Sequence, residues 1–265
     1  MPYERRAVGI LIFSLIISAT PSYGTVKMRL IDGRPVADGV YVDGHGPFRF
    51  LLDTGANTNL IARGLARRIG MKVTFKTGFA SVSSENIAIG SAGNEISVDT
   101  VRAAGQEFLL TDIEAFQGGS SDIQGLLGQA FLSQFDYLLD LKRKQLTFGA
   151  QNRNGIRSRF KMISGRPTVS TSLGEMVLDS GAPALVISGS KPGTTFGRTA
   201  EMRTTAGSEQ VVLRPERLLI QGRAIWQGDA VAIRGQLDPG VDGLLPVRFF
   251  RSVYVCNSAG YVVFE

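Results

Sequence analysis

Two short acidic motifs in this chain have the residue types for shared acid–base chemistry. One reads Asp-Thr-Gly-Ala from Asp53 and the other reads Asp-Ser-Gly-Ala from Asp179. Each follows a short apolar run, which predicts a strand that ends at the aspartate in a packed setting. Two carboxylates held close together cannot both ionise cheaply, so they would share one proton. Such a pair could take a proton from a water molecule and donate one to a carbonyl oxygen.

The neighbours of the two aspartates have supporting roles in this hypothesis. Glycine lets backbone N–H groups approach a carboxylate closely, because it has no Cβ. A threonine or serine hydroxyl can hydrogen-bond across the pair and hold the two loops in register. The predicted supporting residues of the two loops are Thr54, Gly55, Ala56, Ser180, Gly181 and Ala182.

The two motifs belong to a longer internal repeat. A Ser/Thr-Ala-Gly-x-Glu segment occurs at residues 91–95 and again at 205–209. A Gly-Leu-Leu segment follows in each half, at residues 125–127 and 243–245. Three markers in the same order indicate an internal duplication, which would bring one aspartate from each half face to face. The polar stretch 150–159 is the predicted linker.

The elements that would position these motifs are mostly short strands. The fold class expected is all-β with small helices, in two similar lobes. One helix is predicted at residues 59–69, where apolar residues fall at helical spacing before Gly70. Strand-like runs, apolar or alternating and bounded by turn residues, occur at residues 36–42, 48–52, 96–101, 137–141 and 145–148. The expected division is a leader at 1–24, one lobe at 25–152 and a second lobe at 153–265.

The first residues have the layout of a secretory signal peptide. Arg5 and Arg6 precede an apolar run over residues 7–19, and small residues lead to a processing site after Gly24. The run is short for a stable membrane span, although an uncleaved anchor is the alternative. The expected location is periplasmic or secreted.

Composition excludes several classes of protein. His45 is the single histidine and Cys256 the single cysteine, so a zinc site with two histidines is impossible and no internal disulfide can form. His45 lies in a turn-forming cluster, which argues against a Ser-His-Asp triad. No Walker-type loop occurs, and the net charge of +6 comes from scattered basic residues. Neither a metal, a cofactor nor a nucleic-acid partner is expected.

The run Phe-Leu-Leu-Asp-Thr-Gly-Ala at 50–56, with Gly-Leu-Leu-Gly-Gln-Ala-Phe-Leu at 125–132, resembles the retropepsin-like and pepsin-like aspartic protease superfamily. The resemblance is close over residues 30–150 and looser over 165–265. It implies closed β-barrel lobes, a catalytic dyad of Asp53 and Asp179, and a hairpin flap over a cleft that binds a peptide or protein substrate. The flap candidates by this resemblance are Ser91, Ala92, Gly93, Thr205, Ala206 and Gly207.

The second half departs from the family pattern. Pro246 stands where the family has glycine, and Pro183 directly follows Ala182, so the second lobe could be altered. Alanine at positions 56 and 182 removes a hydroxyl that pepsins have, which predicts raised pKa values for the dyad.

Three interpretations stay open at this point. The first is a monomeric aspartic endopeptidase, and the second is a dimeric peptidase whose own second lobe is degenerate. The third is a bilobal protein of the same fold that binds an extended peptide without cutting it.

Overall fold

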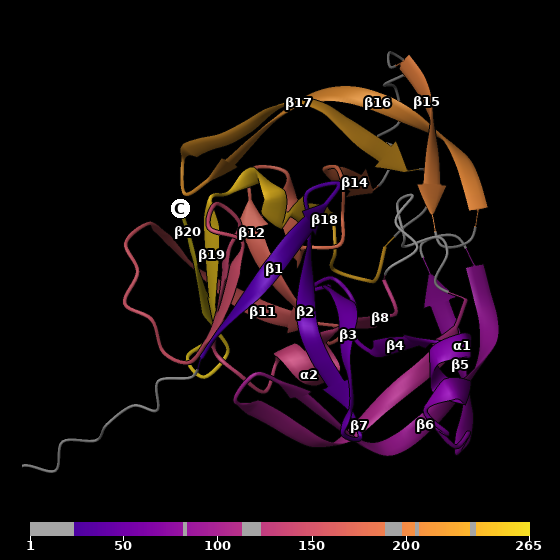
Figure 1. The fold of residues 1–265 in the computed structure, drawn as a ribbon. Helices are drawn as coiled ribbons and strands as arrows, with labels where there is room; N and C mark the ends of the chain where they lie inside the picture. Colours follow the sequence, from indigo (N-terminus) through magenta and orange to yellow (C-terminus); the bar gives the residue numbers. More distant parts are fainter. Residues whose placement is uncertain (1–23, 82–83, 113–122, 189–197, 205–206, 234–236) are drawn as a thin grey trace, which may run out of the picture.

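The computed structural model describes residues 24–81, 84–112, 123–188, 198–204, 207–233 and 237–265. Strands dominate it from end to end, as predicted (Figure 1). The helices among the described residues are short: α1 (Arg63–Arg68), α2 (Gln129–Leu132) and the 3₁₀ helix η2 (Val247–Phe249). The all-β class is therefore confirmed, while closure of each sheet into a barrel stays a prediction.

The first half of the chain forms one sheet around its acidic motif. In it, β3 pairs in parallel with β8, β8 pairs antiparallel with β4, and β4 pairs in parallel with β7. This arrangement buries β8 between neighbours on both sides, which suits its continuous apolar sequence. The strands of this half are β1 (Thr25–Ile31), β2 (Arg34–Val42), β3 (His45–Leu52), β4 (Asn59–Ala62), β5 (Phe75–Ser81), β6 (Ser84–Val98), β7 (Val101–Thr111) and β8 (Gly125–Leu127).

The second half repeats this pairing pattern. Here β13 pairs in parallel with β18, β18 pairs antiparallel with β14, and β14 pairs in parallel with β17. The repeat in pairing matches the repeat in sequence, with Gly243–Pro246 in the place of Gly125–Leu127. The strands are β11 (Ile156–Ile163), β12 (Arg166–Thr171), β13 (Gly174–Asp179), β14 (Val186–Ser188), β15 (Arg198–Thr204), β16 (Gly207–Ile220), β17 (Arg223–Ile233) and β18 (Gly243–Pro246).

A third sheet joins the two halves. Its remaining strands are β9 (Tyr137–Asp140), β10 (Gln145–Phe148), β19 (Ser252–Cys256) and β20 (Tyr261–Phe264). The order is β1, β10, β9, β19, β20, β11, and every pairing in it is antiparallel. We call this the shared sheet, because β9 of the first half pairs directly with β19 of the second.

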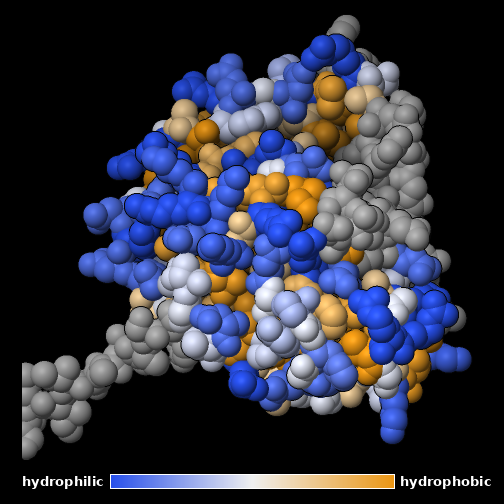
Figure 2. Space-filling view, viewed as in Figure 1, coloured by the Kyte–Doolittle hydropathy of each residue, from blue (hydrophilic) through white to orange (hydrophobic). Residues whose placement is uncertain are grey.

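The apolar core runs through both halves. Its largest cluster extends from Val26 in β1 to Phe264 in β20. Phe131 of α2 packs against Phe135 and Phe148, with ring centroids 5.2 and 6.2 Å away. On the face shown in Figure 2, hydrophilic residues cover most of the left-hand part, as expected when apolar side chains are packed inside.

Several sequence predictions need correction. The helix predicted at 59–69 is only Arg63–Arg68, because Asn59–Ala62 is a buried strand held between β7 and β8. Tertiary pairing overrides the helical spacing there. The strand predicted at 96–101 crosses the turn between β6 and β7, and the predicted linker 150–159 ends in β11 from Ile156. The other four predicted strands lie in β2, β3, β9 and β10, apart from the last residue of the 137–141 run, which follows β9.

The predicted leader falls almost wholly outside the described residues. Among the residues that are described, no helix is long and apolar enough to cross a membrane.

Candidate functional site

The two acidic motifs sit at equivalent places in the repeated sheets. Asp53 directly follows β3, and its N–H donates to the carbonyl of Leu127 in β8 at 2.9 Å. Asp179 is the last residue of β13 and pairs with Pro246 of β18. Both strands are buried at this end, so each carries its carboxyl group toward the middle of the molecule.

The hydroxyls of Thr54 and Ser180 lock the two loops together. Thr54 Oγ1 donates to the carbonyl of Leu178 at 2.6 Å and accepts from the N–H of Ser180 at 3.0 Å. Ser180 Oγ donates to the carbonyl of Leu52 at 2.6 Å and accepts from the N–H of Thr54 at 2.9 Å. Both side chains are buried, and each satisfies backbone groups of the opposite loop. The predicted cross-contact of the hydroxyls is therefore what the structure contains.

The carboxyl groups of Asp53 and Asp179 hydrogen-bond to each other. Asp53 Oδ1 accepts from the N–H of Gly55 at 2.9 Å. Asp179 Oδ1 accepts from the N–H groups of Gly181 and Ala182, both at 2.8 Å. The two acidic side chains, which lie far apart in the sequence, thus form one compact pair.

Burial governs the ionisation of this pair. Desolvation raises the pKa of Asp53, and the hydrogen bond from the N–H of Gly55 is the largest effect that opposes the rise. Desolvation raises the pKa of Asp179 well above the usual range, and the negative charge of Asp53 raises it further. The pair therefore favours one shared proton.

The two glycines are required by the closeness of the loops. A Cβ on Gly55 would lie 2.3 Å from Cγ of Asp179, and a Cβ on Gly181 would lie 2.5 Å from Oδ2 of Asp53. No side chain fits at either position without displacing the opposite carboxyl group.

The predicted flap of the first half is in the wrong place. Ser91, Ala92 and Gly93 lie inside β6, where Ser91 is buried and pairs with Phe108. The turn of the β5–β6 hairpin instead follows Ser81, which pairs with Ser84. By the registers of the two hairpins, Ser81 and Ser84 correspond to Thr204 and Gly207, and the shared Ala-Gly pair misled the sequence comparison.

The flap candidates of the second half are better placed. Gly207 begins β16 and pairs with Thr204 across the β15–β16 hairpin. Thr205 and Ala206 lie outside the described residues. The β5–β6 and β15–β16 hairpins both lie on the right-hand side of the molecule in Figure 1.

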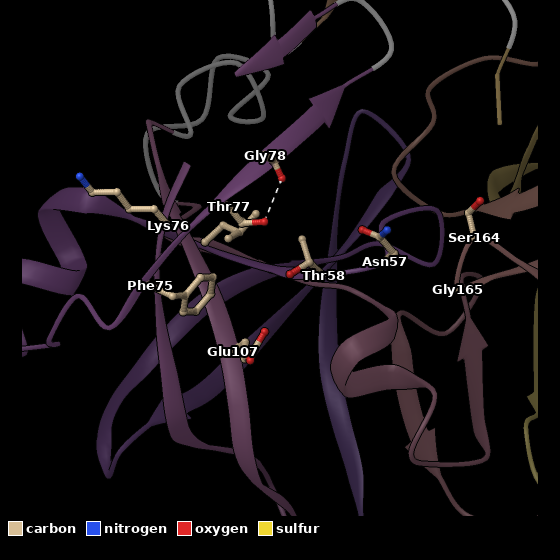
Figure 3. Close-up of a pocket in the computed structure, with 10 residues that line it drawn as sticks. Asn57, Thr58, Phe75, Lys76, Thr77, Gly78, Glu107, Ser164 and Gly165 are labelled. Atoms are coloured by element: carbon tan, nitrogen blue, oxygen red, sulfur yellow. Dashed lines mark hydrogen bonds between the residues drawn. The ribbon is translucent and has the colours of Figure 1, made fainter. Parts of the chain in front are cut away.

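A pocket of about 810 Å³ opens beside the Asp53 loop. Asn57 and Thr58, just after the acidic motif, form one wall, and β5 forms another from Phe75 to Gly78. Figure 3 shows the carboxyl group of Glu107 at the base of this space, while the ammonium group of Lys76 extends away from it. The turn of Ser164 and Gly165 completes the pocket, so both halves of the chain contribute to it.

A second repeat escaped the sequence comparison. The run Asp-Gly-Arg-Pro at 32–35 recurs as Ser-Gly-Arg-Pro at 164–167, and each forms the tight turn before β2 or β12. Each turn reaches the acidic loop of the other half. A Cβ on Gly165 would touch Cβ of Asn57 at 3.4 Å, and Arg248 Nη1 donates to the carbonyls of Asp32 and Pro183, both at 3.1 Å.

The departure at Pro246 changes only the neighbouring helix. In the first half, a Cβ on Gly128 would lie 2.2 Å from the carbonyl oxygen of Thr58, so glycine is needed there. In the second half, Pro246 adopts φ −66° and ψ 127° and leads into the single 3₁₀ turn η2 instead of an α-helix. The Asp179 loop keeps all the hydrogen bonds described above.

The described residues contain no group of three or more histidine, cysteine, aspartate or glutamate side chains that could hold a metal ion. His45 begins β3 and is exposed, so it does not join the acidic pair. The arrangement has the parts for acid–base chemistry on a water molecule.

A comparison with known protein families agrees with this geometry. Residues 39–131 match the family model described as aspartyl protease. Among solved structures, a retropepsin-like aspartic protease from Rickettsia conorii aligns with 48% of this chain and 90% of its own, at 20% identity and a TM-score of 0.36. No curated protein matches at a significant level. The segment that the aspartyl protease model matches contains Asp53 and its loop, and it ends at Phe131 in α2.

Proposed function

We propose that this protein is an aspartic endopeptidase in which Asp53 and Asp179 form the catalytic dyad. One observation carries the proposal: the carboxyl groups of two duplicated loops hydrogen-bond to each other, with the loops fixed by the hydroxyls of Thr54 and Ser180. A buried acidic pair costs stability, so its presence argues for a catalytic role.

The ionisation of the pair suggests a role for each aspartate. We assign the shared proton to Asp179, because the negative charge of Asp53 raises the pKa of Asp179, and Asp53 is then the ionised partner. Asp53 takes a proton from a water molecule while the oxygen of that water attacks the peptide carbonyl carbon. Asp179 donates its proton to the carbonyl oxygen. The tetrahedral intermediate then collapses, the C–N bond breaks, and the leaving nitrogen receives a proton from the dyad. The half-exposed position of Asp53 leaves it accessible to solvent.

The direct test measures the rate of cleavage as a function of pH, with a library of peptides from a denatured protein as the substrate. The rate requires one ionised and one protonated carboxyl group, so it rises with pH through the lower pKa of the dyad and falls through the higher one. Because burial raises both pKa values, we expect a maximum at mildly acidic to near-neutral pH. Cleavage should be blocked by a hydroxyethylene peptide analogue, which mimics the tetrahedral intermediate.

Two outcomes would count against this proposal. A maximum below about pH 3 would contradict the raised pKa values. Binding of the analogue and of peptides with no cleavage at any pH would favour a peptide-binding protein instead.

We also propose that the pocket beside the Asp53 loop receives a substrate side chain. Its position just after the acidic motif and beside β5 supports this role. No salt bridge of Glu107 occurs within the part of the chain that the structure describes, so its carboxylate is available to a basic side chain of the substrate.

We expect Glu107→Gln to reduce kcat/KM for peptides with lysine or arginine at the preferred position by up to about 5-fold, the value of one exposed ion pair. Peptides with an uncharged residue there should be cleaved as before. The matched control is Glu95→Gln, which removes a carboxylate outside the pocket that pairs with Arg102. An equal loss on basic and uncharged peptides would remove Glu107 from substrate selection.

The location proposed is periplasmic or secreted. It rests on the basic and apolar layout of residues 5–24, and it is tested by N-terminal sequencing of exported protein, where the first residue should be Thr25.

A further inference from the structure

Gln129 hydrogen-bonds to the backbone of the Asp53 loop. It follows Gly128 at the start of α2 and is 3% exposed. Its side-chain Nε2 donates to the carbonyl of Thr54 at 2.9 Å, and its backbone N–H donates to the carbonyl of Ala56 at 2.8 Å. One residue therefore binds two carbonyl groups of the acidic loop.

The contact with Thr54 reaches Asp53 through a single peptide unit. The carbonyl of Thr54 and the N–H of Gly55 belong to the same planar group. That N–H donates to Asp53 Oδ1 at 2.9 Å. By fixing the carbonyl end of the plane, Gln129 fixes the direction of the N–H at the other end, which stabilises the ionised form of Asp53.

Tyr137 lies next to the side chain of Gln129. Its side chain is fully buried in β9, and it interacts with the side-chain amide of Gln129. Burial raises the pKa of Tyr137. Within the described residues, neither the Tyr137 hydroxyl nor Gln129 Oε1 has a hydrogen-bond partner. A bond from the hydroxyl to Oε1 would satisfy both buried atoms and orient the amide with its NH₂ toward Thr54.

Within the described part of the second half, no side chain gives an equivalent support. Val247 follows Gly-Leu-Leu-Pro as Gln129 follows Gly-Leu-Leu-Gly, and its buried apolar side chain offers no donor. Asp179 Oδ1 accepts backbone bonds from Gly181 and Ala182. The two acidic loops are thus held by different means.

We propose that Gln129, oriented by Tyr137, is a positioning residue that sets the ionisation of Asp53 without a matching device at Asp179. The proposal rests on the peptidase function proposed above. Gln129 hydrogen-bonds to neither carboxyl group, so it acts through the peptide unit of Thr54 and Gly55.

The test is Gln129→Met, which keeps the length of the side chain and removes both polar atoms. We expect kcat to fall about 10- to 100-fold, with KM within about 2-fold of the wild type. A weaker N–H bond raises the pKa of Asp53, so the acidic limb of the pH profile should move to higher pH by about half a unit or more. A merely structural loss would lower the rate equally at every pH.

Two further variants make the result decisive. Gln134→Met is the matched control, because Gln134 also donates to a carbonyl, that of Ala130, but is exposed and outside the loop. It should behave as the wild type. Tyr137→Phe removes one oxygen and leaves the Thr54 contact possible, so we expect a smaller shift of the acidic limb in the same direction. Tyr137→Phe also tests the proposal if Gln129→Met fails to fold.

The outcomes distinguish this positioning role from the peptidase function on which it rests. An active wild type with an unshifted acidic limb in folded Gln129→Met overturns the positioning role alone. An unshifted limb in Tyr137→Phe overturns the part assigned to Tyr137. A wild type that cleaves no peptide overturns the peptidase function and the positioning role with it.

Discussion

Replacing either Asp53 or Asp179 with asparagine is expected to lower kcat by about 10³- to 10⁴-fold while the fold persists. Asparagine has nearly the same shape as aspartate but neither takes a proton from water nor donates a carboxylic proton. The two side chains hydrogen-bond to each other, so each change would remove one half of the proton exchange that we propose. Initial rates on a cleaved peptide measure the loss.

The structural controls for this experiment are direct. Thermal unfolding should show both variants folded, because neutralising one member of a buried acidic pair relieves repulsion and desolvation. Asp99→Asn is the matched control, since Asp99 is exposed with φ 53°, a conformation that asparagine also tolerates. Full activity in Asp179→Asn would remove the second half from the mechanism. Sedimentation would then be needed to look for a dimer that pairs two first halves.

The second large effect is expected from Gly55→Ala. The added Cβ would lie 2.3 Å from Cγ of Asp179 and 2.5 Å from its Oδ2, so the two loops must separate or the carboxyl group must turn away. Overpacking of this kind destabilises a protein by about 1–3 kcal/mol. We expect the loss of activity to be larger, at least about 10²-fold, because a displacement of about 1 Å at a reacting group has that effect.

Gly64→Ala is the matched control for this change. Gly64 lies in α1, and a Cβ there would meet no atom within 4 Å. Alanine should leave kcat unchanged and stabilise the short helix by about 0.5–1 kcal/mol. Urea denaturation gives the free energies of unfolding, and peptide cleavage gives kcat. Wild-type kcat in Gly55→Ala would show that the loops are not held as closely as the structure has them.

The sequence predicted the parts of the site that depend on local residue types. An apolar run before Asp-Thr-Gly specifies a buried strand with a carboxyl group at its end, and the same pattern at Asp179 indicates a duplication. The hydroxyls of Thr54 and Ser180 followed from the same symmetry. These features could be predicted because a duplicated fold repeats the contacts between its equivalent loops.

The parts that the sequence did not predict depend on long-range pairing. Asn59–Ala62 has helical spacing, yet its pairing with β7 and β8 makes it a strand. The first flap candidate failed because Ala-Gly occurs both inside β6 and beside the β15–β16 turn, and only the register distinguishes the two. Gln129 was visible as the residue after Gly-Leu-Leu-Gly, but its contact with Thr54 spans 75 positions.

The shared sheet also limits how the two halves can move. Along β1, Thr25–Lys27 pair with β10, and from Met28 the strand pairs with β2. Along β11, Ile156–Arg159 pair with β20, and from Phe160 the strand pairs with β12. Each strand changes partner within a single residue step. A movement of one half relative to the shared sheet would therefore have to bend the backbone of β1 between Lys27 and Met28, or that of β11 between Arg159 and Phe160.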